Sequence, residues 1–219
     1  MSDINKKNLI VFLGLKNCGK DYNSQPYIDM GFKRISFADP LREMVWGILD
    51  YTPNKALTYD EFKKSDTILR KPNKFWNLFA KKIVVTTGRK ILQNAGSVIK
   101  SMFGETIWAD LWAKSVLESE QNVVCTDCRF TYEVSKALSL SRKGYNVSFI
   151  WVCYEKANFN EILKDKHESE ALSQYIYYNQ EKYGLHDLCE IKPKVLKQII
   201  SDFEQQQTEE TLMHSCVAR

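Results

Sequence analysis

A glycine-rich stretch near the N-terminus constrains this chain more than any other feature. An apolar run of strand length ends at Gly14, and Gly19 and Lys20 follow with the spacing G-x-x-x-x-G-K. This pattern directly after a strand is typical of a loop that binds phosphate groups. Glycines let the backbone curl until several N–H groups point at one anion, and the following helix directs the positive end of its dipole to the same place. The spacing therefore predicts a phosphate-binding loop at residues 14–21.

Two residues of this loop bear on nucleotide binding. Lys20 supplies a flexible point charge for the outer phosphates of a nucleoside triphosphate. Asp21 stands where Ser or Thr commonly contacts Mg²⁺, and a carboxylate can hold a magnesium-bound water instead. The alternative interpretation is a glycine-bearing turn that carries a lysine by chance. Because a strand directly precedes the loop, we favour phosphate binding.

Length, charge and cysteine content limit the number of domains, the class of ligand and the cellular compartment that we expect. Its 219 residues suit one domain with a small insertion. A net charge of +4 fits small anionic ligands and is too weak to argue for DNA. The six cysteines lack the spacing of a disulfide framework or a zinc site, which favours a reducing cytoplasm. No apolar stretch is long enough to span a membrane, so we expect no membrane partner. Because the net charge is weak, we also expect no direct binding of nucleic acid.

Apolar periodicity and turn residues predict alternating strands and helices. Strands are predicted at residues 8–13, 32–37, 122–126 and 145–153. Helices are predicted from Asp39 to near Thr52, from Thr87 to Gly104, at residues 107–116 and 131–143, and from Pro193 onward. We expect Pro26 to cut short the helix after the loop and the chain to fray from Gln205.

Two of these helices should each bury one face. The predicted buried face of the helix after Asp39 consists of Leu41, Met44, Val45, Ile48 and Leu49. The predicted buried face of the helix after Thr87 consists of Ile91, Leu92, Ala95, Val98, Ile99 and Met102.

The order of elements predicts an α/β fold. Strand, helix and strand at residues 122–153 form a β-α-β unit, which pairs its strands in parallel. We therefore predict a doubly wound parallel sheet flanked by helices. In such sheets ligands gather at the carboxyl ends of the strands. Lys20, Asp39 and Asp127 each follow a strand end, so we expect them to be neighbours.

Arginines at two helix starts are candidates for phosphate binding. Thr87-Gly88-Arg89 opens a helix with a cation in its first turn, where the helix dipole disfavours it unless an anion binds there. Just after a strand, Asp127 could hold magnesium or its waters, and Arg129 could clamp a second phosphate. The alternatives are a solvated surface arginine for Arg89, and a surface ion pair or a plain helix cap for Asp127 and Arg129.

The long polar segment at residues 155–184 carries further charges. Lys164 and Lys166 lie beside His167-Glu168-Ser169-Glu170. Basic residues on a mobile flap would suit closure over phosphates. On these residues alone, an exposed charged helix is the favoured interpretation.

Taken in order, these motifs resemble one family, the deoxynucleoside monophosphate kinases of tailed bacteriophages. The resemblance covers residues 9–203, and the G-K-D form of the loop is the family's own. It rests on the ordered blocks Gly14-x4-Gly19-Lys20-Asp21, Ser36-Phe37-Ala38-Asp39-Pro40-Leu41-Arg42, Thr87-Gly88-Arg89-Lys90-Ile91-Leu92-Gln93, Asp127-Cys128-Arg129-Phe130-Thr131-Tyr132-Glu133 and His167-Glu168-Ser169-Glu170.

The resemblance implies a P-loop kinase fold with a helical acceptor-binding region and a lid. The chain would form a single domain over residues 1–219, with an acceptor-side insertion at 54–86 and the lid at 155–184. Family members move the terminal phosphoryl group of ATP onto a deoxynucleoside 5′-monophosphate, with Mg²⁺, for dNTP synthesis. A homodimer is compatible with this interpretation.

The resemblance also implies roles for individual residues. Lys20, Arg89, Asp127 and Arg129 would be catalytic. The ATP phosphates would bind Gly14, Leu15, Lys16, Asn17, Cys18, Gly19, Lys20 and Asp21. The acceptor would bind Asp39, Arg42, Arg89, Gln93 and Arg129. Magnesium would bind near Asp21 and Asp127, and the lid would contribute Lys164, Lys166, His167 and Glu170.

Some features depart from the family pattern and leave alternatives open. Pro26 interrupts the helix after the loop, Arg42 stands where lysine is commoner, and residues 54–82 match no family block, so the preferred base stays open. The rival functions are a P-loop ATPase that acts on DNA, a non-catalytic nucleotide-binding partner of a replication complex, and a kinase of the phosphomevalonate type.

Overall fold

The computed structural model of the chain describes residues 6–48, 87–154, 163–164 and 167–217. The chain divides into two compact units. Unit 1 consists of Met1–Phe37 and Trp112–Arg219, and unit 2 of Ala38–Leu111. The predicted insertion at residues 54–86 lies outside the described residues.

Unit 1 is built on a five-stranded sheet with the order β2-β3-β1-β4-β5. The central strand β1 (Lys7–Leu13) pairs in parallel with β3 (Val123–Cys125) and with β4 (Tyr145–Val152), and β2 (Lys33–Arg34) pairs in parallel with β3. These pairings confirm the predicted α/β class and the parallel arrangement of the first four strands.

The strand at the far edge of the sheet differs from the prediction. β5 (Leu188–Ile191) pairs antiparallel with β4, with Leu188 opposite Val152, so the sheet is mostly rather than wholly parallel. The reason is the path of the chain. The Cys153 N–H donates to the Asp187 carbonyl oxygen at 2.7 Å, so the chain returns to the end of the sheet that it left and must run back along β4.

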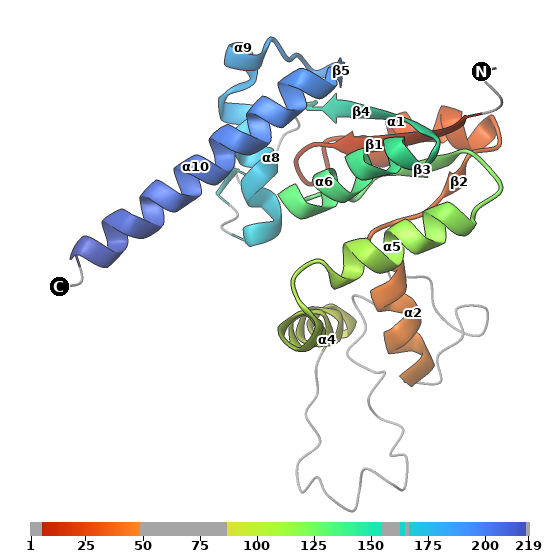
Figure 1. Cartoon of the computed structure of the whole chain (residues 1–219), viewed down its shortest axis with the longest axis horizontal. Helices are drawn as coiled ribbons and strands as arrows, with labels where there is room; N and C mark the ends of the chain where they lie inside the picture. The colour runs from red at the N-terminus through yellow and green to blue at the C-terminus, as the bar shows by residue number, and fades with distance from the viewer. Residues whose placement is uncertain (1–5, 49–86, 155–162, 165–166, 218–219) are drawn as a thin grey trace, which may run out of the picture. The chain divides into compact units, whose positions relative to one another are not determined.

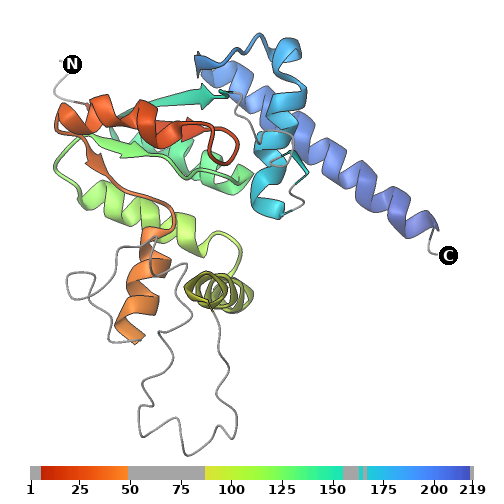
Figure 2. The same cartoon turned by 180° about the vertical axis from the view of Figure 1, so that it is seen from behind.

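Helices cover both faces of the central strand. Leu9, Val11, Phe12 and Leu13 of β1 are fully buried, as a strand covered on both faces requires. α1 (Lys20–Asp29) and α6 (Thr131–Ser139) lie on opposite faces of the sheet, as Figures 1 and 2 show from the two sides. On the α1 side, the rings of Phe12 and Tyr27 meet edge to face with centroids 6.0 Å apart.

The first helix is longer than predicted. α1 runs to Asp29 with Pro26 in its interior, so the expected early end is wrong. Proline removes one helical donor, the one that would bond the Tyr22 carbonyl, and Tyr22 is 84% exposed where water can replace it. The carbonyl of Pro26 itself keeps its helical partner, because the Met30 N–H donates to it at 3.1 Å. A single lost bond on the solvent side therefore does not end the helix.

The described part of unit 1 after β4 consists of three helices and one short strand. After β4 the chain forms α8 (Glu168–Tyr178), α9 (Gln180–Tyr183), β5 and α10 (Pro193–Val217). The predicted fraying from Gln205 is wrong, since α10 continues to Val217. Glutamines donate to glutamates one turn ahead, Gln205 to Glu209 at 3.1 Å and Gln206 to Glu210 at 2.8 Å, and such pairs support an exposed helix.

Unit 2 is helical in its described part. It contains α2 (Asp39–Ile48), α4 (Gly88–Phe103) and the start of α5 (Ile107–Glu118). Val45 and Leu92 form its buried centre, with Leu41, Met44, Ile91 and Ala95 packed against them. The predicted buried faces are too wide, because Ile48, Val98 and Met102 are exposed. Leu49 lies outside the described residues.

Unit 1 includes the end of α5. Its residue Trp112 is fully buried, its indole N–H donates to the Ile35 carbonyl at 3.1 Å, and its ring stacks on Phe37 at 4.0 Å. Trp112 thereby holds the chain that leaves β2. Within the described residues, no helix is both long enough and apolar enough to cross a bilayer.

Replacement of Trp112 by phenylalanine tests this contact. The variant leaves a cavity and removes the donor to the buried Ile35 carbonyl, so we expect the free energy of unfolding to fall by about 2–4 kcal/mol. Leu117→Ala, on the same helix but 44% exposed, is the control and should change it by about 0.5 kcal/mol or less. Urea denaturation measures both variants. Equal effects would show that Trp112 does not hold the chain after β2.

Candidate functional site

The loop between β1 and α1 has a curled backbone that only glycine allows at its first residue. Gly14 has a φ of +151°, and a Cβ there would lie 2.2 Å from the Val152 carbonyl oxygen of β4. Asn17 and Gly19 also have positive φ, +61° and +97°. The Cys18 N–H donates back to the Leu15 carbonyl at 3.3 Å and closes a turn. The loop is therefore folded tightly against the end of β4.

Lys20, the first residue of α1, folds its side chain back over the loop. Its ammonium donates to the carbonyl oxygens of Gly14 and Leu15, each at 2.7 Å, and contacts the Cys18 sulfur at 3.8 Å. Burial lowers the pKa of Lys20, and the nearby charge of Arg129 lowers it further. A pinned ammonium in poorly solvated surroundings is a strong partner for an incoming anion.

The start of α1 adds backbone donors to the same place. The N-cap of the helix is Gly19, which has no side chain to compete for the first N–H groups. These N–H groups carry the positive end of the helix dipole. Loop, helix start and Lys20 together have the chemistry of a phosphate site, and binding itself stays a prediction.

Asp21 is tied to the ends of two strands. Its Oδ1 accepts from Arg34 at 2.6 Å and from the Thr126 hydroxyl at 2.7 Å, and Arg34 also donates to Thr126 at 2.9 Å. Sequence reasoning did not select Arg34 or Thr126 as site residues. Both lie at carboxyl ends of β2 and β3, and that position was the available signal.

Asp127 joins the end of β3 to the chain that leaves β2. Its Oδ1 accepts from the Phe37 N–H at 2.8 Å and from the Cys125 thiol at 3.3 Å. Burial raises the pKa of Cys125 and Cys128 well above the ordinary thiol value, so both are protonated at neutral pH. Asp39 lies in unit 2, and its predicted place beside Lys20 and Asp127 stays a prediction.

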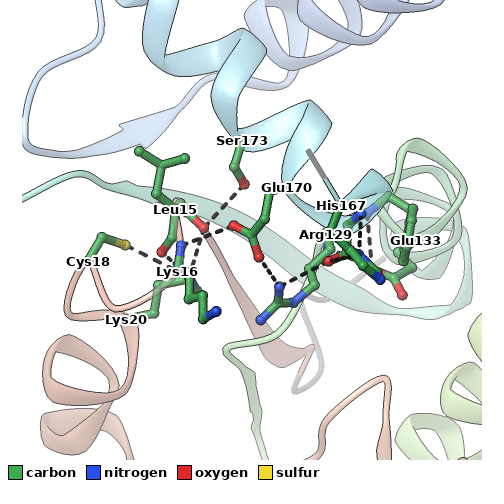
Figure 3. Close-up of polar contacts among 12 residues, drawn as sticks. Leu15, Lys16, Cys18, Lys20, Arg129, Glu133, His167, Glu170 and Ser173 are labelled. Carbon is green, nitrogen blue, oxygen red and sulfur yellow. Dashed lines mark hydrogen bonds and ion pairs between the residues drawn. The ribbon is translucent and has the colours of Figure 1, made fainter. Parts of the chain in front are cut away.

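Arg129 lies beside the loop and is bound by α8. Its Nη1 donates to Glu170 Oε1 and to the Ser169 hydroxyl at 3.4 Å. The second oxygen of Glu170 accepts from the Lys16 N–H of the loop at 3.1 Å. One helical turn later, the Ser173 hydroxyl donates to the Gly14 carbonyl at 3.2 Å. Figure 3 shows Glu170 between the loop and Arg129.

Glu133 supports Arg129 from the other side. It is 6% exposed, and its Oε2 accepts from the N–H groups of Arg129 at 2.7 Å and Phe130 at 3.2 Å. These bonds cap the start of α6. Burial, with the charge of Asp127 as a second cause, raises the pKa of Glu133 to about 8. Its position three residues after the N-cap was the signal that could have selected it.

Asp21 and Asp127 are the predicted magnesium ligands, and magnesium binding by them stays a prediction. No group of three or more His, Cys, Asp or Glu side chains suited to a metal occurs in the part of the chain that the structure describes. Magnesium needs only one or two protein carboxylates when phosphate oxygens and waters supply the rest. Asp21 and Asp127 have carboxylate oxygens, the donor type that magnesium prefers, and lie near the carboxyl ends of strands β2 and β3.

The remaining predicted acceptor residues belong to unit 2. Thr87 is the N-cap of α4, as predicted, and its hydroxyl accepts from the Lys90 N–H at 3.3 Å. Arg89 and Gln93 are both exposed and lie four residues apart, on one side of this helix. In α2, Arg42 and Asp39 form an ion pair at 2.7 Å.

The predicted lid residues have varied surroundings. Lys164 is exposed, and Lys166 lies outside the described residues. His167 is the N-cap of α8 and its Nδ1 accepts from the Ser169 N–H at 3.2 Å. Glu170 is 3% exposed and touches the loop, rather than lying on an exposed helix. Whether this segment closes as a lid stays a prediction.

Comparisons with known proteins add no relative. A scan against models of protein families gave no match, and a search of curated proteins also gave none.

The raised pKa of Glu133 predicts a specific pH dependence of stability. Between pH 4.5 and about 8 the folded chain binds more protons at this carboxyl group than the unfolded chain. Its contribution to stability is therefore complete below pH 4.5 and is lost as the pH rises toward 8. Glu133→Gln keeps an oxygen for the two N–H groups and removes the titration.

We therefore expect the stability of the unmodified chain, relative to Glu133→Gln, to fall between about pH 5 and pH 8. The slope should be at most about 1.4 kcal/mol per pH unit. Denaturant unfolding at several pH values measures it, and Glu118→Gln, an exposed change in α5, should run parallel to the unmodified chain. Parallel curves for Glu133→Gln as well would mean that Glu133 stays ionised in the folded chain.

Proposed function

We propose that this chain is a nucleoside monophosphate kinase, which transfers the γ-phosphoryl group of ATP to a deoxynucleoside 5′-monophosphate. The observation that carries the proposal is the curled loop with the Lys20 ammonium held across it and Arg129 beside it. The ordered motifs shared with the phage kinases supply the acceptor class.

On the donor side, the chain offers backbone N–H groups and one ammonium to the ATP phosphates. Residues 14–21 would surround the β- and γ-phosphates. The Lys20 ammonium uses two donors on the loop's own carbonyls, which leaves the N–H that faces the Cys18 sulfur to turn to phosphate. Asp21 and Asp127 would hold magnesium, which would supply positive charge to neutralise the phosphates.

On the acceptor side, guanidinium groups would hold the monophosphate. Arg129 is bonded to Glu170, which also accepts from the Lys16 N–H of the loop, so we expect Arg129 to contact a phosphate bound there. Arg89, Gln93, Asp39 and Arg42 are assigned to the acceptor by the family motifs. An exposed Arg89 in the first turn of α4 is easiest to explain by an anion that binds both it and the helix start.

The reaction would then proceed by positioning rather than by covalent catalysis. An oxygen of the acceptor monophosphate attacks the γ-phosphorus, and the bond from that phosphorus to the oxygen it shares with the β-phosphate breaks. Lys20 and Arg129 would stabilise the charge on the phosphoryl group in transit. Closure of the segment after β4 would exclude water, which would otherwise hydrolyse ATP.

An ATP-consumption assay against each deoxynucleoside and ribonucleoside monophosphate tests this function. We expect ADP to form with Mg²⁺ only when an accepted monophosphate is present. Lys20→Met should lower the turnover number about 100-fold or more, because it removes charge stabilisation in the transition state. Lys143→Ala, an exposed lysine away from the loop, should stay within about twofold of the unmodified chain.

Other outcomes of the same assay would contradict the proposal in distinct ways. ATP hydrolysis stimulated by DNA and indifferent to monophosphates would indicate an ATPase. ATP binding without consumption would indicate a non-catalytic nucleotide-binding partner. Transfer to phosphomevalonate but to no nucleotide would indicate a kinase of the phosphomevalonate type.

A further inference from the structure

Two segments far apart in the sequence meet at the loop through one buried carboxylate. Glu170 lies in the first turn of α8, and its two oxygens have different partners, the Lys16 N–H and the Arg129 guanidinium (Figure 3). Burial of a carboxylate to 3% exposure costs free energy unless its oxygens accept hydrogen bonds. Glu170 is therefore placed by the loop and by Arg129, and it in turn restricts both.

The surrounding residues of α8 reinforce this contact. His167 Nδ1 lies 2.9 Å from the Ser169 hydroxyl, which accepts from Arg129 Nη1 at 3.4 Å. Ser173, three residues after Glu170 and on the same side of the helix, donates to the Gly14 carbonyl. The first two turns of α8 thus present several polar contacts to the loop and to Arg129.

The geometry at Arg129 shows what this contact can do for a ligand. Both of its side-chain contacts to α8 use Nη1. A guanidinium is planar and has five N–H donors, so bonds at one nitrogen fix the direction of the others. An arginine without such a partner has a long, flexible side chain that would sample many directions.

We propose that Glu170 is a positioning residue that holds Arg129 and the phosphate loop as one unit, so that the remaining donors of Arg129 face a phosphate bound in the loop. This inference rests on the proposed function for the identity of the ligand. It gives Glu170 a role in the resting site, independent of any lid movement.

A double-mutant cycle between Glu170 and Arg129 tests the proposal. The variants are Glu170→Gln, Arg129→Gln and the pair, and the measured quantities are kcat for phosphoryl transfer and Kd for ATP. We expect Glu170→Gln to lower kcat by about tenfold or more. Arg129→Gln is compared in two backgrounds, the unmodified chain and Glu170→Gln. Where it changes kcat or Kd in the first, its effect on that quantity in the second should be at most about threefold.

Two controls separate positioning from a merely structural role. Glu168→Gln removes the same charge from the same turn at an exposed position and should leave kcat and Kd within about twofold. If Glu170→Gln does not fold, Glu170→Asp, which keeps the charge but is one methylene shorter, takes its place in the cycle. Circular dichroism and thermal unfolding verify folding at the assay temperature.

Three results would overturn the proposal. Effects of the two substitutions that multiply independently would show that Glu170 does not act through Arg129. A lowered Tm with unchanged kcat and Kd would make Glu170 a structural anchor only. An Arg129→Gln variant with wild-type kcat and Kd would leave nothing for Glu170 to position. If the unmodified chain binds ATP but transfers no phosphate, the proposed function fails and the inference about Glu170 does not. The double-mutant cycle is then evaluated from the Kd for ATP alone.

Discussion

The close approach of Gly14 to β4 is the constraint on which the rest of the site depends. A side chain at this position would collide with the Val152 carbonyl, so only glycine lets the chain turn directly after β1. The turn brings the carbonyls of Gly14 and Leu15 toward the start of α1, where the Lys20 ammonium binds them. It also aims the Lys16 N–H at α8. The positions of the Lys20 ammonium and the Lys16 N–H therefore depend on the backbone conformation at Gly14.

The cations beside the loop are held by contacts within the chain. Lys20 and Arg129 bring positive charge to the loop, and Glu170 places a buried carboxylate between the loop and Arg129. Glu133 fixes the backbone at Arg129 and, with its raised pKa, carries little negative charge near neutral pH. These contacts hold the two cations in place without a ligand.

Local features of the fold could be predicted from the sequence, and long-range ones could not. The strand before Gly14 and the cap at Thr87 follow from residues close together in the chain, and both are present. The contact of Glu170 with Lys16 joins residues 154 positions apart, so no local pattern shows it. The antiparallel β5 was missed because its direction depends on where α9 returns the chain. The early helix end predicted from Pro26 was wrong, because the free-energy cost of one lost hydrogen bond depends on solvent exposure. The spacing of residues in the sequence does not show that exposure.

A crystal structure of the chain with Mg²⁺ and a non-hydrolysable ATP analogue tests the loop most directly. In it we expect the β- and γ-phosphates to accept hydrogen bonds from the backbone N–H groups of residues 16–20 and from the Lys20 ammonium, with Arg129 turned toward the γ-phosphate. An analogue bound elsewhere, with these N–H groups in contact with solvent, would contradict this expectation.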